Sequence, residues 1–525
     1  MATLQDQVEA GYRTTGPVVT LGSALDGPSV IQEPKIAIPL AMMNRHGLIA
    51  GATGTGKTKT LQLMAEQLSA QGVPVFVADL KGDLSGLARP GASNTRIDER
   101  LASIGWQWAP AGAPVDFVSL TGHNGVQLRA TVSSFGPLLL SKVLDLNETQ
   151  ASVMSLVFKV CDDQGLALLD FADLREVLKY LSSDEGKPVL KEYGGMSTAT
   201  VGVLLRKMVE LEQQGAERFF GEPEFDIDDL LHTTSDGRGV VTCLSLADCQ
   251  DKPALFSTFM MWLLAELYQN LPEAGDLPKP KLVFFFDEAH LLFRNASKQF
   301  LDQVEQVVRL IRSKGVGIFF VTQTPKDVPD EVLGQLANRV QHALRAHTPD
   351  DEAALRATVR TFPKTEFYDL QETVTSLGIG EALVTGLNAR GVPTPVVAAR
   401  LVPPTSRMAP LTPPEFAEEE RESDLMREYG TPVNRESAYE ILTRRLARPE
   451  PPAARGSSGP FREPAPAPAR SGRGPSGLGK AVTGGLLGAL TGTLARTVGR
   501  ELVRGVFGMI GGRAPRTRRT TRSRW

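Results

Sequence analysis

Residues 47–58 read GLIAGATGTGKT and decide the fold. The first four residues form a short apolar run, and the next eight fit the pattern G-x-x-x-x-G-K-[ST] directly before a helical stretch that reaches about residue 70. Glycines let such a loop fold back, so that its backbone N–H groups point inward at the N-terminus of the helix. The sequence therefore predicts a buried strand, an anion-binding loop and a helix in succession.

The same loop predicts a site for ATP with Mg²⁺. Eight residues are expected to contribute to it: Gly51, Ala52, Thr53, Gly54, Thr55, Gly56, Lys57 and Thr58. We expect Lys57 to reach the β- and γ-phosphates and the hydroxyl of Thr58 to bind Mg²⁺. The alternative is a glycine-rich turn that binds nothing, but the strand before the loop and the helix after it favour the nucleotide site.

Further apolar strands follow along the chain. They are expected at residues 75–79, 240–244, 282–286, 317–322 and 339–344, and helices at 253–270 and 297–314 lie between them. Continuous apolar strands that alternate with helices predict an α/β fold with a mainly parallel sheet covered on both faces. Residues 381–385 and 394–400 flank a glycine-containing loop and are expected to form a closing hairpin.

Two carboxylates follow the apolar run 282–286. Because ligands of open α/β sheets bind at the carboxyl ends of the strands, Asp287 is expected to hold Mg²⁺ through water. Glu288 is expected to polarise the attacking water as a general base. A surface acidic pair at a strand end is the alternative. His290 is expected to be a packing or supporting residue without a catalytic role.

A polar side chain also ends the strand at 317–322. Gln323 would lie beside the γ-phosphate there, where an amide can sense the phosphate or orient the water. This interpretation depends on the other two strand-end groups, because a single glutamine is a weak signal.

The helix at 297–314 carries two arginines opposite its apolar stripe. Arg309 and Arg312 either form a solvated basic face or supply an arginine finger to the site of a neighbouring subunit, where a cation stabilises transition-state charge. The sequence leaves these two interpretations equal, and it leaves open which arginine would be the finger.

The composition along the chain predicts seven parts. They are a lead-in of β character (1–45), the first part of the ATPase core (46–137), a helical insertion (138–235), the second part of the core (236–402), a charged helical extension (412–447), a Pro/Gly-rich linker (448–475) and a Gly- and Arg-rich tail (476–525). The linker and tail are expected to be disordered.

Composition also restricts the class of protein. The 525 residues carry a net charge of −3, but residues 476–525 alone carry +9, so a basic tail follows an acidic body. Three scattered cysteines suit a reducing compartment rather than a disulfide framework, and the N-terminus does not resemble a signal peptide. No uncharged run reaches the roughly 18 residues of a membrane span. We therefore expect a cytoplasmic protein.

Within the tail, Arg496, Arg500 and Arg504 recur at a spacing that puts them on one helical face. Such a segment could lie on an anionic membrane surface or bind a partner. The favoured alternative is a disordered tail that contacts polyanions adventitiously.

Three motifs together resemble a known family. Residues 44–58, the run Phe286-Asp287-Glu288-Ala289-His290, and the segment from Arg312 to Gln323 are similar to the HerA–FtsK family of P-loop ATPases, most closely to bacterial HerA-like proteins of the YjgR type. The resemblance covers roughly residues 38–400. It implies a RecA-like fold and a homo-oligomer: a hexameric ring that hydrolyses ATP and moves double-stranded DNA. It also implies the roles given above for Lys57, Thr58, Asp287, Glu288, Gln323 and Arg312.

The chain departs from the family in one respect. HerA has an N-terminal β-barrel that docks a nuclease, and residues 1–45 are too few for that barrel, so a nuclease partner is doubtful. The run Asp-Glu-Ala-His also occurs in superfamily 2 helicases. Those need further motifs and a second lobe that this sequence lacks, so that interpretation is rejected.

Three functions follow from these observations. The first is an ATP-driven motor on DNA. The second is a motor that transports or remodels a protein or membrane-associated substrate, and the third is a scaffold that binds ATP but turns it over slowly. The acidic body lacks the basic footprint usual in DNA-binding proteins, although the pore of a ring can be basic while its exterior is acidic.

Overall fold

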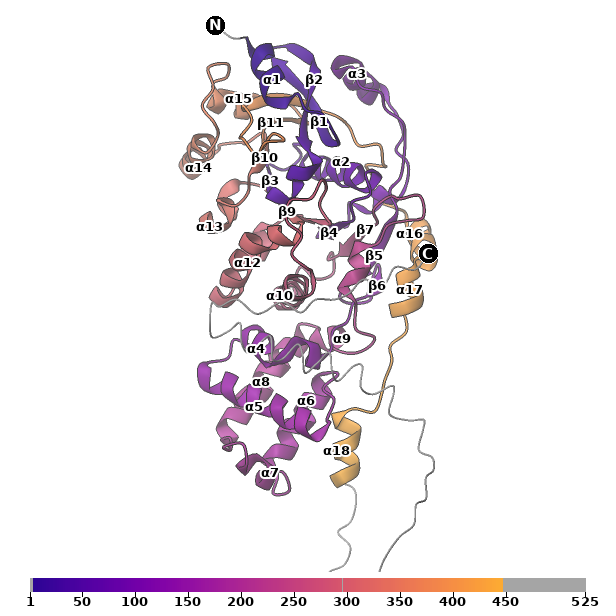
Figure 1. The fold of residues 1–525 in the computed structure, drawn as a ribbon, viewed down its shortest axis with the longest axis vertical. Helices are drawn as coiled ribbons and strands as arrows, with labels where there is room; N and C mark the ends of the chain where they lie inside the picture. Colours follow the sequence, from indigo (N-terminus) through magenta and orange to yellow (C-terminus); the bar gives the residue numbers. More distant parts are fainter. Residues whose placement is uncertain (1–2, 295, 447–525) are drawn as a thin grey trace, which may run out of the picture.

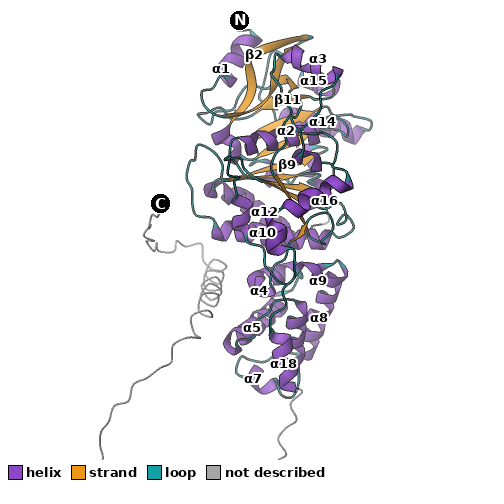
Figure 2. Cartoon of the chain, turned by 90° about the vertical axis from the view of Figure 1, so that its right-hand side faces the viewer, coloured by secondary structure: helices purple, strands orange, loops and turns teal. Residues whose placement is uncertain are grey.

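The computed structural model describes residues 3–294 and 296–446, and the predicted linker and tail (448–525) lie outside these residues. Figure 1 shows two stacked regions: a strand-rich region in the upper half and a helical region below it. In the side view of Figure 2 the strands form one twisted layer with helices on both sides. Within the described residues no helix is long and apolar enough to cross a membrane.

All twelve strands of the described residues belong to one sheet, in the order β2-β1-β12-β11-β10-β3-β9-β8-β4-β7-β5-β6. Their bounds are β1 (Val18–Asp26), β2 (Ser29–Pro39), β3 (Gly47–Ala50), β4 (Val75–Asp79), β5 (Val115–Ser119), β6 (Val126–Gln127), β7 (Val241–Ser245), β8 (Leu282–Phe286), β9 (Val316–Thr322), β10 (Asn338–His342), β11 (Glu381–Thr385) and β12 (Val397–Leu401). The eight strands from β10 to β6 are parallel, and the other four are antiparallel. The predicted strands and the mainly parallel α/β fold are confirmed.

Helices cover both faces of this sheet. Their bounds are α1 (Leu4–Tyr12), α2 (Lys57–Ala70), α3 (Thr95–Ile104), α10 (Pro253–Asn270), α11 (His290–Phe293), α12 (Lys298–Leu310), α13 (Asp330–Leu333), α14 (Pro349–Arg360) and α15 (Leu370–Ser376). Alternate residues of β8 show the division: Phe284 and Phe286 belong to the buried cluster that contains α10 and α12, whereas Val283 and Phe285 belong to the cluster that contains α2. A strand that is apolar at every position is therefore buried on both sides.

The first 45 residues, expected to be a lead-in, complete the antiparallel end of the sheet. Residues 18–26 pair on one side with β12 and on the other with β2, and α1 packs against β2. Tyr12 of α1 donates a hydrogen bond to the carbonyl oxygen of Pro395 at 2.7 Å. The N-terminal segment thus belongs to the same layer as the loop at 51–56.

The lower region contains the helices between β6 and β7. They are α4 (Val132–Val143), α5 (Glu148–Gln164), α6 (Phe171–Ser182), α7 (Lys187–Lys191), α8 (Thr198–Gln213) and α9 (Ala216–Phe219). Helical structure begins at Val132 rather than at residue 138, because Thr131 caps α4 by accepting a hydrogen bond from the backbone N–H of Ser134. The long helix α8 lies inside the predicted helical insertion at 138–235.

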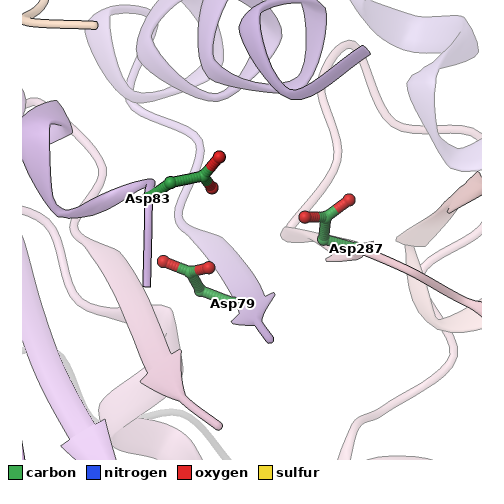
Figure 3. Close-up of side chains that lie close together, drawn as sticks. All are labelled: Asp79, Asp83 and Asp287. Carbon is green, nitrogen blue, oxygen red and sulfur yellow. The ribbon is translucent and has the colours of Figure 1, made fainter. Parts of the chain in front are cut away.

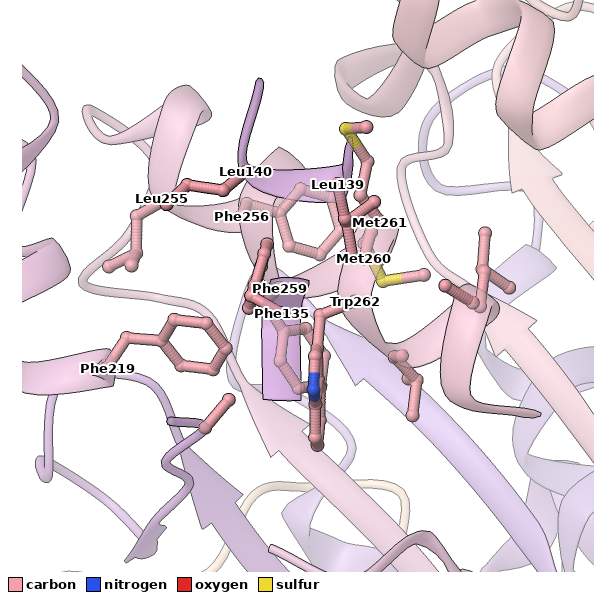
Figure 4. Packing of buried hydrophobic residues seen from close by; sticks show 14 of the residues in the cluster. Phe135, Leu139, Leu140, Phe219, Leu255, Phe256, Phe259, Met260, Met261 and Trp262 are labelled. Carbon is pink, nitrogen blue, oxygen red and sulfur yellow. The ribbon is translucent and has the colours of Figure 1, made fainter. Parts of the chain in front are cut away.

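Helix α10 joins the two regions. It is apolar on all sides, so it is buried by the sheet on one face and by the lower helices on the other. Phe219 of the lower region lies edge-on to Phe259 and to Trp262 of α10, with ring centroids 6.0 and 6.1 Å apart, and Figure 4 shows Phe135 beside them. The shared aromatic core fixes the helical region against the strand-rich region.

The chain after β12 runs along α2. In this segment, residues 402–412, the carbonyl oxygen of Met408 accepts from Lys59 at 2.6 Å, and that of Arg407 accepts from Gln62 at 2.9 Å. The carboxylate of Glu66 accepts from the backbone N–H groups of Thr405 (2.7 Å) and Ser406 (3.0 Å) and from the Ser406 hydroxyl (2.6 Å). One face of α2 therefore holds the segment in place.

The charged extension then continues to the lower region. It contains α16 (Pro413–Glu422), α17 (Asp424–Tyr429) and α18 (Ala438–Leu446). Helix α18 packs on α6, with Ala438 and Leu442 fully buried, and Figure 1 shows it beside the lower helices. The extension is thus packed along both regions.

The contacts of Glu66 give a first prediction. Replacing Glu66 with alanine leaves three buried donors without their acceptor, which costs about 2 kcal/mol of unfolding free energy. Urea unfolding measures this. The control is Glu99→Ala, an exposed glutamate on α3, which should change stability by less than about 0.5 kcal/mol. Equal stability of the two variants would show that other contacts hold residues 402–412.

Candidate nucleotide-binding and hydrolysis site

The sheet order brings three strand ends together at one edge. Strand β9 lies between β3 and β8, with Ala50 paired to Thr322 and Phe286 paired to Phe320. The loops that follow are also joined: the N–H of Gly51 donates to the carbonyl oxygen of Thr322 (3.2 Å), and that of Ala289 donates to Val321 (2.8 Å). The residues after β3, β9 and β8 therefore form one continuous surface.

The glycine-rich loop has the backbone that its sequence predicts. Gly51, Gly54 and Gly56 have φ of +155°, +78° and +111°, which other residues rarely adopt. Lys57 begins α2, and its ammonium group donates to the carbonyl oxygen of Ala52 at 3.2 Å. Burial lowers the pKa of Lys57, and the charge of Glu288 partly opposes this. An ammonium turned back over its own loop is placed to bind an anion held by the loop.

His342, at the end of β10, packs against this loop. It is fully buried, and its Nε2 lies 2.9 Å from the hydroxyl of Thr60 on α2. A side chain at Gly51 would meet the His342 Cβ at 2.5 Å, so this close approach requires glycine at position 51. Burial, and next the charge of Lys57, lower the pKa of His342 to about 3. The ring is therefore neutral and serves packing.

Asp287 follows β8 and lies in an acidic cluster. Carboxylate oxygens of Asp79, Asp83 and Asp287 lie within 4.8 Å of one another, and Figure 3 shows the three side chains converging. Burial, and next the charges of Glu288 and Asp79, raise the pKa of Asp287 to about 7, and its Oδ2 has no hydrogen-bond partner. A buried carboxylate oxygen without a partner suits a hard cation that prefers oxygen ligands, such as Mg²⁺.

Glu288 has an unusual backbone and a charged neighbour. Its φ is +48°, a conformation that is costly for a residue other than glycine and is most often found at functional sites. The carboxylate forms an ion pair with Lys81, and its Oε2 lies 3.2 Å from Nδ1 of His290. Burial raises the pKa of Glu288, but the hydrogen bond and charge of Lys81 outweigh it, so the net shift is downward. The group is ionised and can accept a proton.

Gln323 lies on the same edge, one residue beyond β9. Its side chain is exposed, whereas the preceding Thr322 is buried and donates a hydrogen bond to Asp327 at 2.8 Å. Because β9 is the strand between β3 and β8, the tip that carries Gln323 lies between the glycine-rich loop and the two carboxylates. The amide is thus free to contact a ligand held between them.

Arg309 and Arg312 lie away from this edge of the sheet. The predicted helix at 297–314 ends as an α-helix at Leu310 and continues as a 3₁₀ turn (Ile311–Lys314). Arg312 in this turn precedes β9, so the seven residues of the strand separate it from Gln323, roughly 20 Å at the usual rise per residue. Arg309 is on α12 and forms an ion pair with Glu305. Neither arginine lies at the edge that carries Lys57.

The structure adds residues that the sequence analysis missed. Asp79 is the last residue of β4, and Lys81 and Asp83 follow it. Strand β4 pairs with β8, and an apolar strand that ends in polar residues was a usable signal. His342 gave no signal, because only the pairing of β10 with β3 places it under the loop. Arg45 is close to Arg312: burial, and next the charge of Arg312, lower the pKa of Arg45.

These features define the class of the protein. A glycine-rich loop between a parallel strand and a helix, with two carboxylates directly after a nearby parallel strand, is typical of the nucleotide site of a P-loop ATPase. The sequence profile of the family "helicase HerA-like C-terminal" matches residues 28–516. The chain therefore belongs to this HerA-like family and is an ATPase.

Individual relatives are distant. The DNA double-strand break repair helicase HerA of Sulfolobus acidocaldarius is 21% identical over 378 residues, which cover 72% of this chain and 69% of that protein. The protein of the same name from Sulfurisphaera tokodaii is 20% identical over 70% of this chain and 67% of its own length. Among solved structures, the bacterial conjugative coupling protein TrwB (TrwBdeltaN70) has a TM-score of 0.49 at 14% identity, covering 76% of this chain and 91% of that chain.

A second prediction concerns His342. The unfolded chain protonates this imidazole near its ordinary pKa of about 6.5, whereas the folded protein resists protonation until pH is near 3. The unfolded state thus binds one more proton, so stability falls as pH is lowered through this window, by about 1.4 kcal/mol per pH unit. We expect His342→Gln to show a correspondingly weaker decrease between pH 6 and pH 4.

Urea unfolding at several pH values measures the slope. The matched control is His347→Gln, since His347 is exposed on the loop after β10. Its slope should equal that of the unmodified protein. A His342→Gln slope equal to the control would contradict the buried, neutral state of His342.

Proposed function

We propose that this chain is a motor that hydrolyses ATP to move along double-stranded DNA. The observation that supports it most is the meeting of Lys57, Asp287, Glu288 and Gln323 at one sheet edge. DNA as the substrate is supported by the HerA helicases named above, which are DNA double-strand break repair proteins. A motor on protein or membrane-associated substrates, and a slow scaffold, are the alternatives that the substrate test below must exclude.

In this proposal the glycine-rich loop and Lys57 bind the phosphates. Thr58 and Asp287 hold Mg²⁺, which, when bound, neutralises charge on the β- and γ-phosphates. Binding of the cation also keeps Asp287 ionised near neutral pH, where its raised pKa would otherwise leave it partly protonated. Gln323 contacts the γ-phosphate or the attacking water.

Glu288 accepts the proton of the attacking water. While it is paired with Lys81, its proton affinity is lowered, so it is a weaker base than an unpaired carboxylate. Lys81 is 45% exposed, so it can move away at little cost. Release of this ion pair would raise the pKa of Glu288 and activate it, and a negatively charged γ-phosphate beside Lys81 is the simplest cause of such a release.

Arg312 acts in a neighbouring subunit of a homo-oligomer, which we propose is a hexameric ring. Its position on the edge opposite Lys57 excludes contact with its own phosphates but presents it to another copy. Arg45 beside it adds a second cation to that surface. Arg309, already paired with Glu305, is the weaker candidate for the finger.

The proposed place of action is the cytoplasm, where the three cysteines, all buried as free thiols, would stay reduced. Contact of the basic tail with polyanions or anionic membranes stays a prediction. The doubt about a nuclease partner also stays a prediction.

The third prediction separates nucleotide binding from hydrolysis. Lys57→Ala should lose both ATP binding and turnover, because Lys57 contacts the phosphates before the reaction. Glu288→Gln should bind ATP normally and lose turnover by about 10²–10⁴-fold, because only proton transfer is removed. Calorimetry with ATP and a phosphate-release assay measure the two effects.

The same assay tests the substrate. Duplex DNA should stimulate the ATPase of the unmodified protein, and single-stranded DNA, RNA and lipid vesicles should not. Stimulation by vesicles alone would favour the membrane-associated alternative.

The outcome that contradicts the third prediction is near-normal turnover of Glu288→Gln, which would refute the site assignment.

The fourth prediction tests the finger in trans. Arg312→Ala should bind ATP normally and hydrolyse it about 10³-fold more slowly. Mixing it with Glu288→Gln protein should restore activity, because some interfaces then combine an intact base with an intact arginine. The matched control is Arg309→Ala, which should stay active. A fully active monomer, or no rescue despite demonstrated subunit exchange, would contradict action in trans.

A further inference from the structure

One exposed apolar side chain lies beside the glycine-rich loop. Ile379 is 74% exposed, the most exposed of the large hydrophobic residues in the described part of the chain. A single exposed isoleucine is ordinary on a protein surface. This one differs because the turn that carries it, residues 378–381 before β11, is bonded to the nucleotide loop.

Two hydrogen bonds close the turn on itself. The N–H of Glu381 donates to the carbonyl oxygen of Gly378 (3.1 Å), and the N–H of Gly378 donates to the Glu381 carboxylate (2.9 Å). The guanidinium of Arg100, on α3, then donates to the carbonyl oxygens of Ile379 (2.7 Å) and Gly380 (2.9 Å). The backbone under Ile379 is therefore fixed while its side chain extends into solvent.

The turn also contacts the loop that binds phosphate. The N–H of Gly380 donates to the carbonyl oxygen of Thr55 at 3.0 Å, and a Cβ on Gly56 would lie 3.3 Å from that nitrogen. Gly380 has φ of +72°, and a Cβ there would lie 3.1 Å from Arg100, so glycine suits both sides of this contact. Ile379 is thus held at the rim of the nucleotide site.

The direction of the bound nucleotide follows from the sheet order. Asp287 and Glu288, which act on the γ-phosphate, lie on the β9–β8 side of β3. The nucleoside end must then extend toward the other side of β3, where β10 and β11 lie. Ala382 of β11 pairs with His342 of β10, so the start of β11, with its preceding turn, reaches the same edge as the loop.

We propose that Ile379 is the apolar surface on which the base of the bound nucleotide stacks. The contact recognises the presence of a base and not its identity, because isoleucine offers no hydrogen-bonding group and both carbonyl oxygens of the turn accept from Arg100. Adenine and guanine nucleotides should therefore gain about equally from it. This inference rests on the proposed function, since it assumes that the loop holds a nucleoside triphosphate.

The test is Ile379→Ser in the full chain, with binding of ATP, GTP and tripolyphosphate measured by calorimetry. Loss of the apolar contact should weaken ATP and GTP each about 10-fold, while tripolyphosphate, which has no base, should bind as it does to the unmodified protein. The KM for ATP should rise with kcat unchanged. Ile379→Leu should retain normal affinity.

The matched control is Val392→Ser. Val392 is 51% exposed in a turn beyond the other end of β11, at the opposite sheet edge. Its N–H donates to Oδ1 of Asn388, and its carbonyl oxygen accepts from the N–H of Asn388. It should leave all three affinities unchanged.

Three results would overturn the inference. One is unchanged ATP affinity of Ile379→Ser, and another is an equal loss for tripolyphosphate, which would indicate damage to the loop. The third is a change in sedimentation without a change in affinity, which would make Ile379 a subunit contact. Failure of the unmodified protein to bind ATP would instead refute the proposed function, and this inference with it.

Discussion

The parallel pairing of β3, β9 and β8 is the constraint on which the rest of the structure depends. Parallel strands in register end at the same edge, so each residue that follows a strand is brought beside the residues that follow its neighbours. Every residue of these three strands is buried. Apolar burial on both faces therefore fixes the relative positions of Lys57, Glu288 and Gln323, and the flanking helices support that arrangement.

The site brings positively and negatively charged side chains close together, and contacts within the chain do not fully neutralise them. Asp287 is held near its protonated state by burial and by two neighbouring carboxylates, while Lys57 rests on a backbone carbonyl oxygen and Lys81 on the general base. Each of these groups gains a better partner when a magnesium-bound triphosphate is present. Ligand binding would therefore exchange these existing contacts for contacts with the ligand.

Much of the fold could be predicted from the sequence. The continuous apolar runs at β4, β8 and β9 and the glycine-rich loop carry local signals strong enough to fix strand, turn and helix. Two features could not be predicted. The β character of residues 1–45 was expected, but the place of β1 and β2 in the sheet was not, because it depends on the pairing of β1 with β12, almost 400 residues away. The docking of α18 on α6 likewise depends on contacts between distant segments.

The site shows the same difference between local sequence signals and contacts between distant segments. Residues with a motif, such as Thr58 and Asp287, could be identified directly, and their roles stay predictions. Lys81 follows an apolar strand and so carried a usable signal. His342 and Ile379 could not be assigned, because nothing in their local sequence says which strands are neighbours. Strand order, a property of the whole sheet, is the information that the sequence analysis lacked.

The most direct test of the account is a structure of Glu288→Gln protein with ATP and Mg²⁺. The account predicts the triphosphate in the glycine-rich loop, its γ-phosphate between residue 288 and Gln323, and the Lys81 ammonium moved away from residue 288. Arg312 of a second copy should approach the γ-phosphate. A nucleotide bound elsewhere, or a γ-phosphate beyond reach of both residue 288 and Gln323, would contradict the claim that this sheet edge is the catalytic site.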